Sequence, residues 1–310
     1  MFVHPGKWVL NQPEHYVKSA HKKEMAVKTR STVFAGSWYP DNPDACAHEI
    51  QNFLKGSNTI ETQTGTGIGG IVPHAGWYFS GEIACNVIHR LVDAEPPDVI
   101  VVFGMHLHPQ SPHYIMAEGA WETPLGPLPV HTTMAGALTA QFSFRIETPD
   151  NFTKDNTIEL QLPFIKYFFP DTQILTMGLP PVESSLEIAR ATANIAARQG
   201  IKMKVIGSTD LTHYGYNYGF MPKGSGPSAI KWTRDENDKR VIDAMHSMAP
   251  ADVIMEAQEH HNACCAGAAA GAIAAAKTLG ATRAETIAYA TSYDKSPGDS
   301  FVGYVGMVFL

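Results

Sequence analysis

Short runs of apolar residues alternate along this chain with longer stretches of helical spacing. The clearest run is residues 98–103, where Val-Ile-Val-Val-Phe predicts a central strand because β-branched residues favour buried strands. Runs of similar character lie at 68–73, 173–177 and 202–207. Between the first two strands, residues 80–92 repeat their apolar side chains at a helical period. Alternation of this kind predicts an α/β domain with helices on the faces of a sheet.

The rest of the chain continues the alternation. Helical patterns lie at 132–142, 157–168, 183–199, 230–246, 251–258 and 264–279, with Pro163 expected to interrupt the second of them. Strand patterns lie at 114–117, 285–293 and 301–309. We therefore expect one domain over residues 31–310, a three-layer sandwich with a central mixed β-sheet flanked by helices. Residues 1–30 lack apolar periodicity and are expected to form an extension, either a surface arm or a subunit contact in a homo-oligomer.

The composition is that of a globular protein with an acidic balance. The chain has 310 residues, of which 44% are hydrophobic and 17% are charged, and its formal net charge is −7. This balance argues against general nucleic-acid binding, which needs clustered Lys and Arg. No apolar run reaches the roughly 18 to 20 residues that cross a bilayer, and the N-terminus lacks the apolar core of a signal peptide. We expect a cytoplasmic protein with no nucleic-acid or membrane partner.

Cysteine usage favours free thiols. The four cysteines are Cys46, Cys85, Cys264 and Cys265, and a disulfide framework is not expected in a cytoplasmic chain of this size. Neighbouring Cys264 and Cys265 do not suit an ordinary bridge to each other. The sequence contains neither C-x-x-C nor H-E-x-x-H, which disfavours zinc ribbons and zincins.

Histidines follow two of the predicted strands, and strand ends are where open α/β sheets build their sites. His74 precedes Ala75-Gly76, whose small size lets a ligand approach closely. His106 and His108 follow the strand at 98–103 and share one face if that strand continues. Each histidine alone is also consistent with a loop residue bonded to the backbone.

Two later segments carry groups suited to proton transfer or thiol chemistry. Asp210 and His213 follow the strand at 202–207, and in a helical turn they share a side, so Asp210 could orient His213 as a general acid/base. The alternative is that Asp210 caps a short helix and His213 lies on the surface. Cys265 opens the last predicted helix, where the dipole favours a thiolate. A small buried hydrophobe is the alternative, and it applies more strongly to Cys264.

Taken together, these residues suggest a metal site. Two imidazoles and one anion form a facial three-ligand set with open positions, which can bind a substrate and O2 side by side. Glu159, among apolar neighbours in the helical pattern, either faces solvent or points inward to a partner, because an unpaired buried carboxylate is costly.

Six short motifs stand in order between residues 35 and 304. They are A-G-S-W-Y-P at 35–40, V-P-H-A-G-W at 72–77 with S-G at 80–81, T-I-E-L-Q-L-P-F at 157–164, S-T-D-L-T-H-Y-G at 208–215, N-A-C-C at 262–265 and S-F-V-G-Y at 300–304. In these motifs the chain, over about residues 32–310, resembles the Memo-like family, also called AmmeMemoRadiSam system protein B. That family is similar in turn to the catalytic subunits of class III extradiol ring-cleaving dioxygenases, which implies their fold.

The resemblance implies a metal-binding pocket. Its metal ligands would be His74, a histidine of the loop 104–108 and Cys265, and its acid/base pair would be Asp210 and His213. The implied ion is iron(II), with copper or zinc as alternatives. Substrate-binding or supporting positions are expected at Glu159, Trp77 and Tyr214.

The sequence departs from the family pattern at three places. The usual G-P-x-H becomes G-M-H-L-H at 104–108, so either His106 or His108 could be the ligand. The usual E-H-S-x-E becomes D-N-T-I-E at 155–159 and loses a histidine. The G-x-x-P that usually follows the family cysteine becomes A-G-A-A at 266–269.

Three functions are compatible with these residues. The first is a non-haem metal-dependent, dioxygenase-like oxidoreductase acting on a small organic substrate with O2. The second is a non-catalytic binding module with a vestigial pocket, since the family includes members that bind phosphotyrosine peptides. The third is a hydrolase, using either a metal-bound water or Cys265 as nucleophile with His213 as base.

Overall fold

The computed structural model describes residues 27–56 and 67–310 of the chain. Residues 1–26 of the expected N-terminal extension lie outside this described part. Within it, no helix has both the length and the apolar character needed to cross a membrane.

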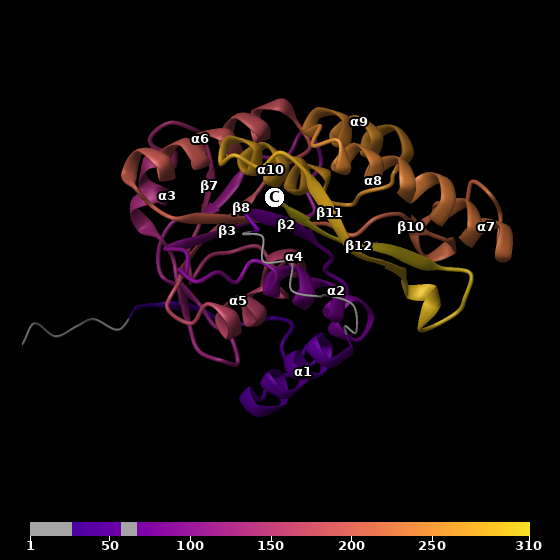
Figure 1. Ribbon diagram of the computed structural model, residues 1–310, viewed down its shortest axis with the longest axis horizontal. Helices are drawn as coiled ribbons and strands as arrows, with labels where there is room; N and C mark the ends of the chain where they lie inside the picture. Colours follow the sequence, from indigo (N-terminus) through magenta and orange to yellow (C-terminus); the bar gives the residue numbers. More distant parts are fainter. Residues whose placement is uncertain (1–26, 57–66) are drawn as a thin grey trace, which may run out of the picture.

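A mixed sheet runs through the middle of the described domain (Figure 1). Its strand order is β10-β12-β2-β9-β3-β8-β4-β7, and β11 pairs with β12. The strands are β2 (Gly69–Val72), β3 (Val99–Gly104), β4 (Tyr114–Met116), β7 (Arg145–Glu147), β8 (Gln173–Gly178), β9 (Met203–Ser208), β10 (His213–Tyr214), β11 (Ala284–Thr291) and β12 (Phe301–Phe309). The central strands β2, β9, β3 and β8 are parallel. A separate small sheet joins β1 (Thr29–Arg30), β5 (Ala120–Trp121) and β6 (Leu128–Pro129).

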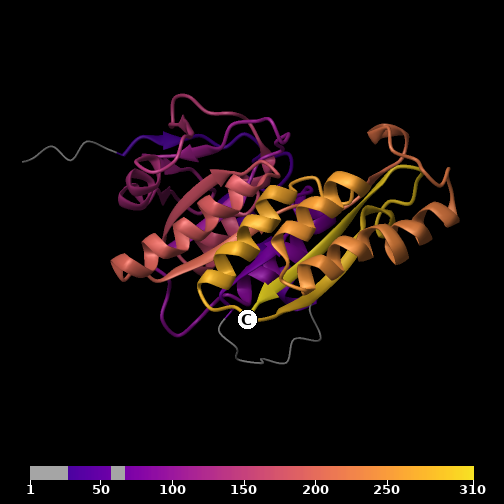
Figure 2. The same ribbon diagram turned by 90° about the horizontal axis from the view of Figure 1, so that it is seen from above.

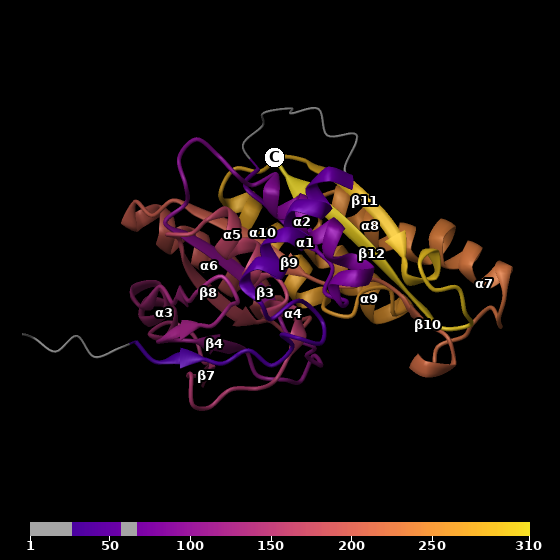
Figure 3. The ribbon, with the colours of Figure 1, turned by 90° about the horizontal axis from the view of Figure 1, so that it is seen from below.

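Helices cover both faces of the large sheet, as the views from above and below show (Figures 2 and 3). One face carries α3 (Thr132–Thr139), α6 (Glu183–Gln199), α8 (Asp238–His246), α9 (Pro250–His260) and α10 (Ala266–Thr278). The other carries α1 (Pro43–Gly56), α2 (Trp77–His89), α4 (Asn156–Glu159) and α5 (Leu162–Phe168). Helix α7 (Pro227–Trp232) lies at one end of the molecule.

Alternation along strand β3 separates the two cores. Val101 and Phe103 pack with the α6 and α10 layer, while Ile100 and Val102 pack with the α2 and α5 layer. The expected three-layer sandwich with a central mixed sheet is therefore confirmed.

Most predicted elements are present, and two differ in a way that has a physical reason. The helix predicted at 157–168 is two helices, because the chain turns after Glu159. Pro163 lies in the first turn of α5, where a backbone N–H would have no partner within the helix, so proline is tolerated there. The helix predicted at 230–246 contains a π-helical stretch, Thr233–Asn237. Short 3-10 helices occur at Tyr216–Tyr218 and Ser292–Asp294.

Helix α10 packs very close to the sheet because both surfaces are made of small residues. A Cβ on Gly207 of β9 would lie 2.7 Å from the carbonyl oxygen of Ala268 and 2.8 Å from Ala272 Cβ. A Cβ on Gly267 would lie 2.2 Å from the carbonyl oxygen of Leu179. Close packing brings the start of α10 to the carboxyl ends of the parallel strands.

Three adjacent strands end at this same edge. Strand β9 lies between β2 and β3, with Val72 opposite Ser208 and Phe103 opposite Gly207. The loops that follow these strands carry His74, His106 and Asp210. Carboxyl ends of parallel strands at a crossover point form a crevice, so the topology gathers these side chains.

A buried carboxylate braces the loop that leads into β10. Asp238 is fully buried; its Oδ1 accepts hydrogen bonds from the backbone N and the hydroxyl of Thr212, and its Oδ2 accepts one from Tyr289 Oη at 2.8 Å. A Cβ on Gly303 would lie 2.0 Å from Asp238 Oδ2, so only glycine leaves room for this carboxylate. Asn237 continues the network, because its Nδ2 donates to Thr212 Oγ1 at 2.9 Å. These hydrogen bonds fix the position of Thr212, the residue that precedes His213.

The contact at Gly267 predicts the effect of one added methyl group. Gly267→Ala should lower the free energy of unfolding by about 1–3 kcal/mol, because overpacking against a backbone carbonyl cannot be relieved by side-chain rotation. Gly136→Ala in α3, where a Cβ meets nothing within 4 Å, is the matched control and should stabilise by about 0.5–1 kcal/mol. Urea unfolding of the two variants checks this, and equal effects would contradict the packing argument.

The Asp238 network predicts a pH-dependent stability. Burial raises the Asp238 pKa from 3.8 to about 6 despite hydrogen bonds from Thr212 and Tyr289 and the nearby His213. The folded protein thus holds this proton more tightly than the unfolded chain, so the stability it contributes is complete below pH 3.8 and is lost as pH rises through 6. This loss should amount to about 3 kcal/mol, at about 1.4 kcal/mol per tenfold change in proton affinity.

Asp238→Asn should remove this dependence while keeping an acceptor for Thr212. The measurement is the difference in unfolding free energy between wild type and variant, taken from pH 4.5 to 7.5. We expect wild type to lose stability relative to the variant across this range. A constant difference would show that Asp238 is ionised throughout.

Candidate metal centre and cavity

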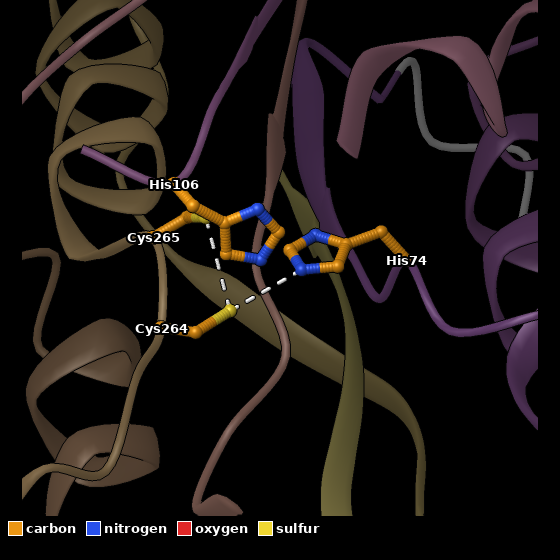
Figure 4. A group of neighbouring side chains, drawn as sticks. All are labelled: His74, His106, Cys264 and Cys265. Carbon is orange, nitrogen blue, oxygen red and sulfur yellow. Dashed lines mark hydrogen bonds between the residues drawn. The ribbon is translucent and has the colours of Figure 1, made fainter. Parts of the chain in front are cut away.

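Four potential metal donors converge where α10 begins (Figure 4). They come from His74, His106, Cys264 and Cys265, and one donor atom of each lies within 4.8 Å of the other three. Cys264 Sγ lies 3.2 Å from His74 Nε2 and 3.8 Å from Cys265 Sγ. Of the two cysteines, Cys264 therefore touches an imidazole directly, although the sequence favoured Cys265 as the ligand.

Hydrogen bonds fix the orientation and tautomer of His74. Its Nδ1 lies 3.0 Å from Ser208 Oγ, and that hydroxyl donates its own proton to the Thr157 carbonyl at 2.7 Å. Ser208 must therefore accept from His74, which places a proton on Nδ1 and leaves Nε2 facing Cys264. The backbone N of His74 also donates to Asp210 Oδ1 at 2.7 Å.

The structure separates His106 from His108. Strand β3 ends at Gly104, and Met105 adopts a left-handed conformation with a φ of 72°, so the alternation that would place both histidines on one face is broken. His106 Nδ1 lies 3.0 Å from Asp155 Oδ2, which turns its other nitrogen toward the cluster. A carboxylate behind a histidine is the usual support of a metal ligand. His108 instead accepts a bond from Gln110 N at 3.3 Å and lies outside the cluster.

Neighbouring groups in the cluster shift one another's pKa values strongly. Burial raises the Cys264 pKa, but the thiol of Cys265 and the imidazoles of His74, His106 and His213 outweigh burial and hold it well below its usual value. Burial and the neighbouring Cys264 sulfur raise the Cys265 pKa. Burial lowers the His106 pKa, but Asp155 and Cys264 raise it to about 10. A thiol of lowered pKa among imidazoles of raised pKa marks a place where a cation can replace protons.

Asp210 and His213 also lie close to the Cys264 sulfur, in a loop and a strand and not in a helical turn. Asp210 Oδ2 is 3.8 Å from His74 Nε2 and 3.9 Å from His213 Nε2, too long for hydrogen bonds but close enough for charge pairing. Burial lowers the His213 pKa, yet attraction to Asp210 and Cys264 raises it to about 10. His213 Nε2 is buried without a hydrogen-bond partner among the described residues.

A cavity of about 590 Å³ opens beside the cluster. His74, His106, Asp210 and His213 all line it. Its mouth carries partly exposed aromatic side chains, and further lining groups are hydroxyls. These are Trp38, Tyr78 and Tyr218, and Ser37, Ser292, Ser296 and Ser300. Among the described residues that line this cavity, none is Lys or Arg.

Three residues expected to bind substrate or support the site hold the fold together instead of lining the cavity. Glu159 Oε1 accepts from Val33 N, Phe34 N and Tyr39 Oη at 2.8–3.0 Å, so it anchors the A-G-S-W-Y-P motif. Trp77 stacks on Phe164 with ring centroids 4.2 Å apart.

Tyr214 is fully buried, and its hydroxyl donates to the Gly224 carbonyl at 2.7 Å. Glu159, by contrast, supports the site indirectly, because the A-G-S-W-Y-P motif that it anchors contains Trp38 at the cavity mouth.

Sequence reasoning missed Asp155, Asn156 and Ser208. Asn156 Nδ2 donates to the His74 carbonyl at 2.8 Å, and Asp155 and Ser208 orient the two ligand histidines. Asp155 and Asn156 directly precede the motif at 157–164, and Ser208 opens the motif at 208–215, in which Asp210 was the expected functional residue. Their polar side chains, in or beside motifs that contain candidate functional residues, are the sequence feature that could have identified them.

Comparison with known proteins finds a family model and similar relatives. The sequence model described as Memo-like protein matches residues 30–308. A MEMO1 family protein of Pyrobaculum aerophilum is 31% identical over 296 residues, covering 91% of this chain and 99% of the relative. One of Pyrococcus furiosus is 32% identical over 292 residues, covering 90% and 98%.

A solved structure gives independent support for the fold alone. An uncharacterized protein from Escherichia coli K12 is similar with a TM-score of 0.50 and 11% identity, covering 77% of this chain and 98% of that one. On the family match and the identity to its relatives over nine-tenths of its length, this chain belongs to the Memo-like protein family.

Proposed function

We propose that this protein is a metal-dependent oxidoreductase that acts on a small, uncharged organic substrate. The observation that carries the proposal is the convergence of two imidazole nitrogens on a thiol, with each imidazole held from behind by Ser208 or Asp155. Pre-oriented nitrogen and sulfur donors suit iron, copper or zinc, and iron(II) is the ion we expect. His74, His106 and Cys264 would hold it.

The chain supplies the remaining functions around that ion. When bound, the ion would supply redox and Lewis-acid chemistry. His213 can hold or deliver a proton at Nε2, since that atom has no hydrogen-bond partner within residues 27–56 and 67–310 and Asp210 stabilises its charged form. The aromatic side chains Trp38, Tyr78 and Tyr218 would stack on a planar substrate, and the serines would bind its polar groups.

The cavity argues against phosphopeptide binding as the main role. Recognition of phosphate normally uses arginine or lysine, and none lines the described cavity. A cysteine-dependent hydrolase is the second candidate, because the Cys264 sulfur lies among His74, His106 and His213. In that case Cys264, not Cys265, would be the nucleophile.

Metal analysis of protein purified without oxygen tests the proposal. We expect about one equivalent of iron, copper or zinc per chain, and His74→Ala should weaken metal binding by at least about tenfold, since even residues behind a ligand contribute about 10- to 100-fold. His108→Ala is the matched control and should retain the metal, because His108 lies outside the cluster.

Two results would count against a metal enzyme. One is a protein with no iron, copper or zinc and no affinity for them. The other is equal metal content in both histidine variants. A stable covalent adduct on Cys264 with an electrophilic ester, in metal-free protein, would favour the hydrolase.

A further inference from the structure

A second cavity, of about 410 Å³, borders the same group of side chains. It shares two lining residues, His213 and Tyr218, with the cavity described above, which we now call the first cavity. The ring centroids of His213 and Tyr218 lie 4.9 Å apart. Because both residues line both cavities, the two rings form the partition between them.

The residues of the candidate metal centre are divided between the two cavities. His74 and His106 line the first cavity, whereas Cys264, in the described part of the chain, lines only the second. Cys264 is also partly exposed, while the neighbouring Cys265 is buried. The exposed part of Cys264 therefore faces the second cavity and not the space that would hold the organic substrate.

The lining of the second cavity is mainly apolar. Leu211, Phe220, Ala257 and Ala263 contribute most of the hydrocarbon surface. No Asp, Glu, Lys or Arg from residues 27–56 or 67–310 lines it, and the charged form of His213 is already paired with Asp210. A charged molecule would lose its hydration here without gaining a partner of opposite charge, so the cavity favours an uncharged occupant.

A redox reaction needs two reactants, because the electrons that one loses must be gained by the other. The first cavity, with its aromatic and hydroxyl lining, suits the organic reactant. A second reactant that used the same mouth would have to pass the bound organic molecule. One that used the second cavity would meet Cys264 directly.

We propose that the second cavity is a separate binding site for a small, uncharged co-reactant such as O2, which reaches the candidate metal centre from the Cys264 side. The role of co-reactant rests on the proposed oxidoreductase function and deepens it, whereas the binding site itself does not depend on a metal. Both cavities can then be filled at once. His213, which lines both, is placed to hold a proton beside either reactant.

Thiol modification of the metal-free, full-length chain tests the route to Cys264. Methyl methanethiosulfonate is a small, uncharged reagent: the Cys264 sulfur forms a disulfide with its methylthio group, methanesulfinate leaves and the thiol proton passes to solvent. Ala257→Leu fills part of the second cavity and should slow this modification about tenfold or more, because the reagent must displace the larger side chain. Ala251→Leu, at an exposed position of the same helix α9, is the matched control and should react like wild type.

Mass spectrometry of the digested protein gives the rate for each cysteine separately. Cys46 and Cys85 are fully buried, so their lack of reaction in every variant shows that the fold is intact.

Xenon tests the site without any thiol chemistry, because this apolar atom binds in apolar cavities and serves as a substitute for O2. Crystals of the metal-free wild type under xenon pressure should show a bound atom beside Leu211, Phe220 and Ala257. Crystals of Ala257→Leu should not. If that variant does not fold, the xenon position in wild type decides alone.

Two results would overturn the inference. One is an equal rate of Cys264 modification in wild type and in folded Ala257→Leu, and the other is xenon in the first cavity alone. Neither measurement needs a metal, so the failure of the proposed function is seen separately. A chain that passes both tests but has no affinity for iron, copper or zinc keeps the second cavity as a small-molecule site and loses the co-reactant role.

Discussion

The candidate site depends on the close approach of α10 to strand β9. Small residues on both surfaces, Gly207 on the strand and Ala268 and Ala272 on the helix, allow the backbones to come near enough that Cys264 N donates to the Asp210 carbonyl at 3.1 Å. Asp210 N in turn lies 3.3 Å from Cys264 Sγ. These contacts tie the loop after β9 to the start of the helix. Larger side chains at this interface would move the two sulfurs away from the histidines, which are fixed to other strands.

Three of the four donor residues are held by residues that are distant from them in the sequence. Ser208 holds His74, Asp155 holds His106 and Thr209 anchors the backbone of Cys265. The geometry is therefore prepared before any ion arrives, and little side-chain freedom remains to be lost on binding. The titratable groups that line the first cavity are gathered in and beside the cluster, and most of the remaining lining consists of aromatic rings and serine hydroxyls.

Periodicity predicted the architecture well because buried strands and amphipathic helices have distinct apolar patterns. Strand β3 and helix α6 are at the expected residues, and Gly200 ends α6 in a left-handed conformation with a φ of 67°. Local turns were not predictable. The positive φ that separates His106 from His108 occurs at Met105, a non-glycine residue whose backbone N donates to the distant Thr157 Oγ1 at 2.7 Å. The sequence favoured Cys265 over Cys264 because Cys265 opens the helix, whereas the contact of Cys264 Sγ with His74 Nε2 is visible only in three dimensions.

The two histidines of the cluster are far from its cysteines along the chain, and His74 and Cys264 are 190 positions apart. They meet only when both helical layers and the sheet between them are in place, so no local segment can form the cluster. An ion that binds here therefore binds the folded state of the whole domain and not an unfolded segment. By linkage, each tenfold excess of free ion over its dissociation constant adds about 1.4 kcal/mol to the stability of that state. The availability of the ion would then set not only activity but also how much folded protein a cell can keep.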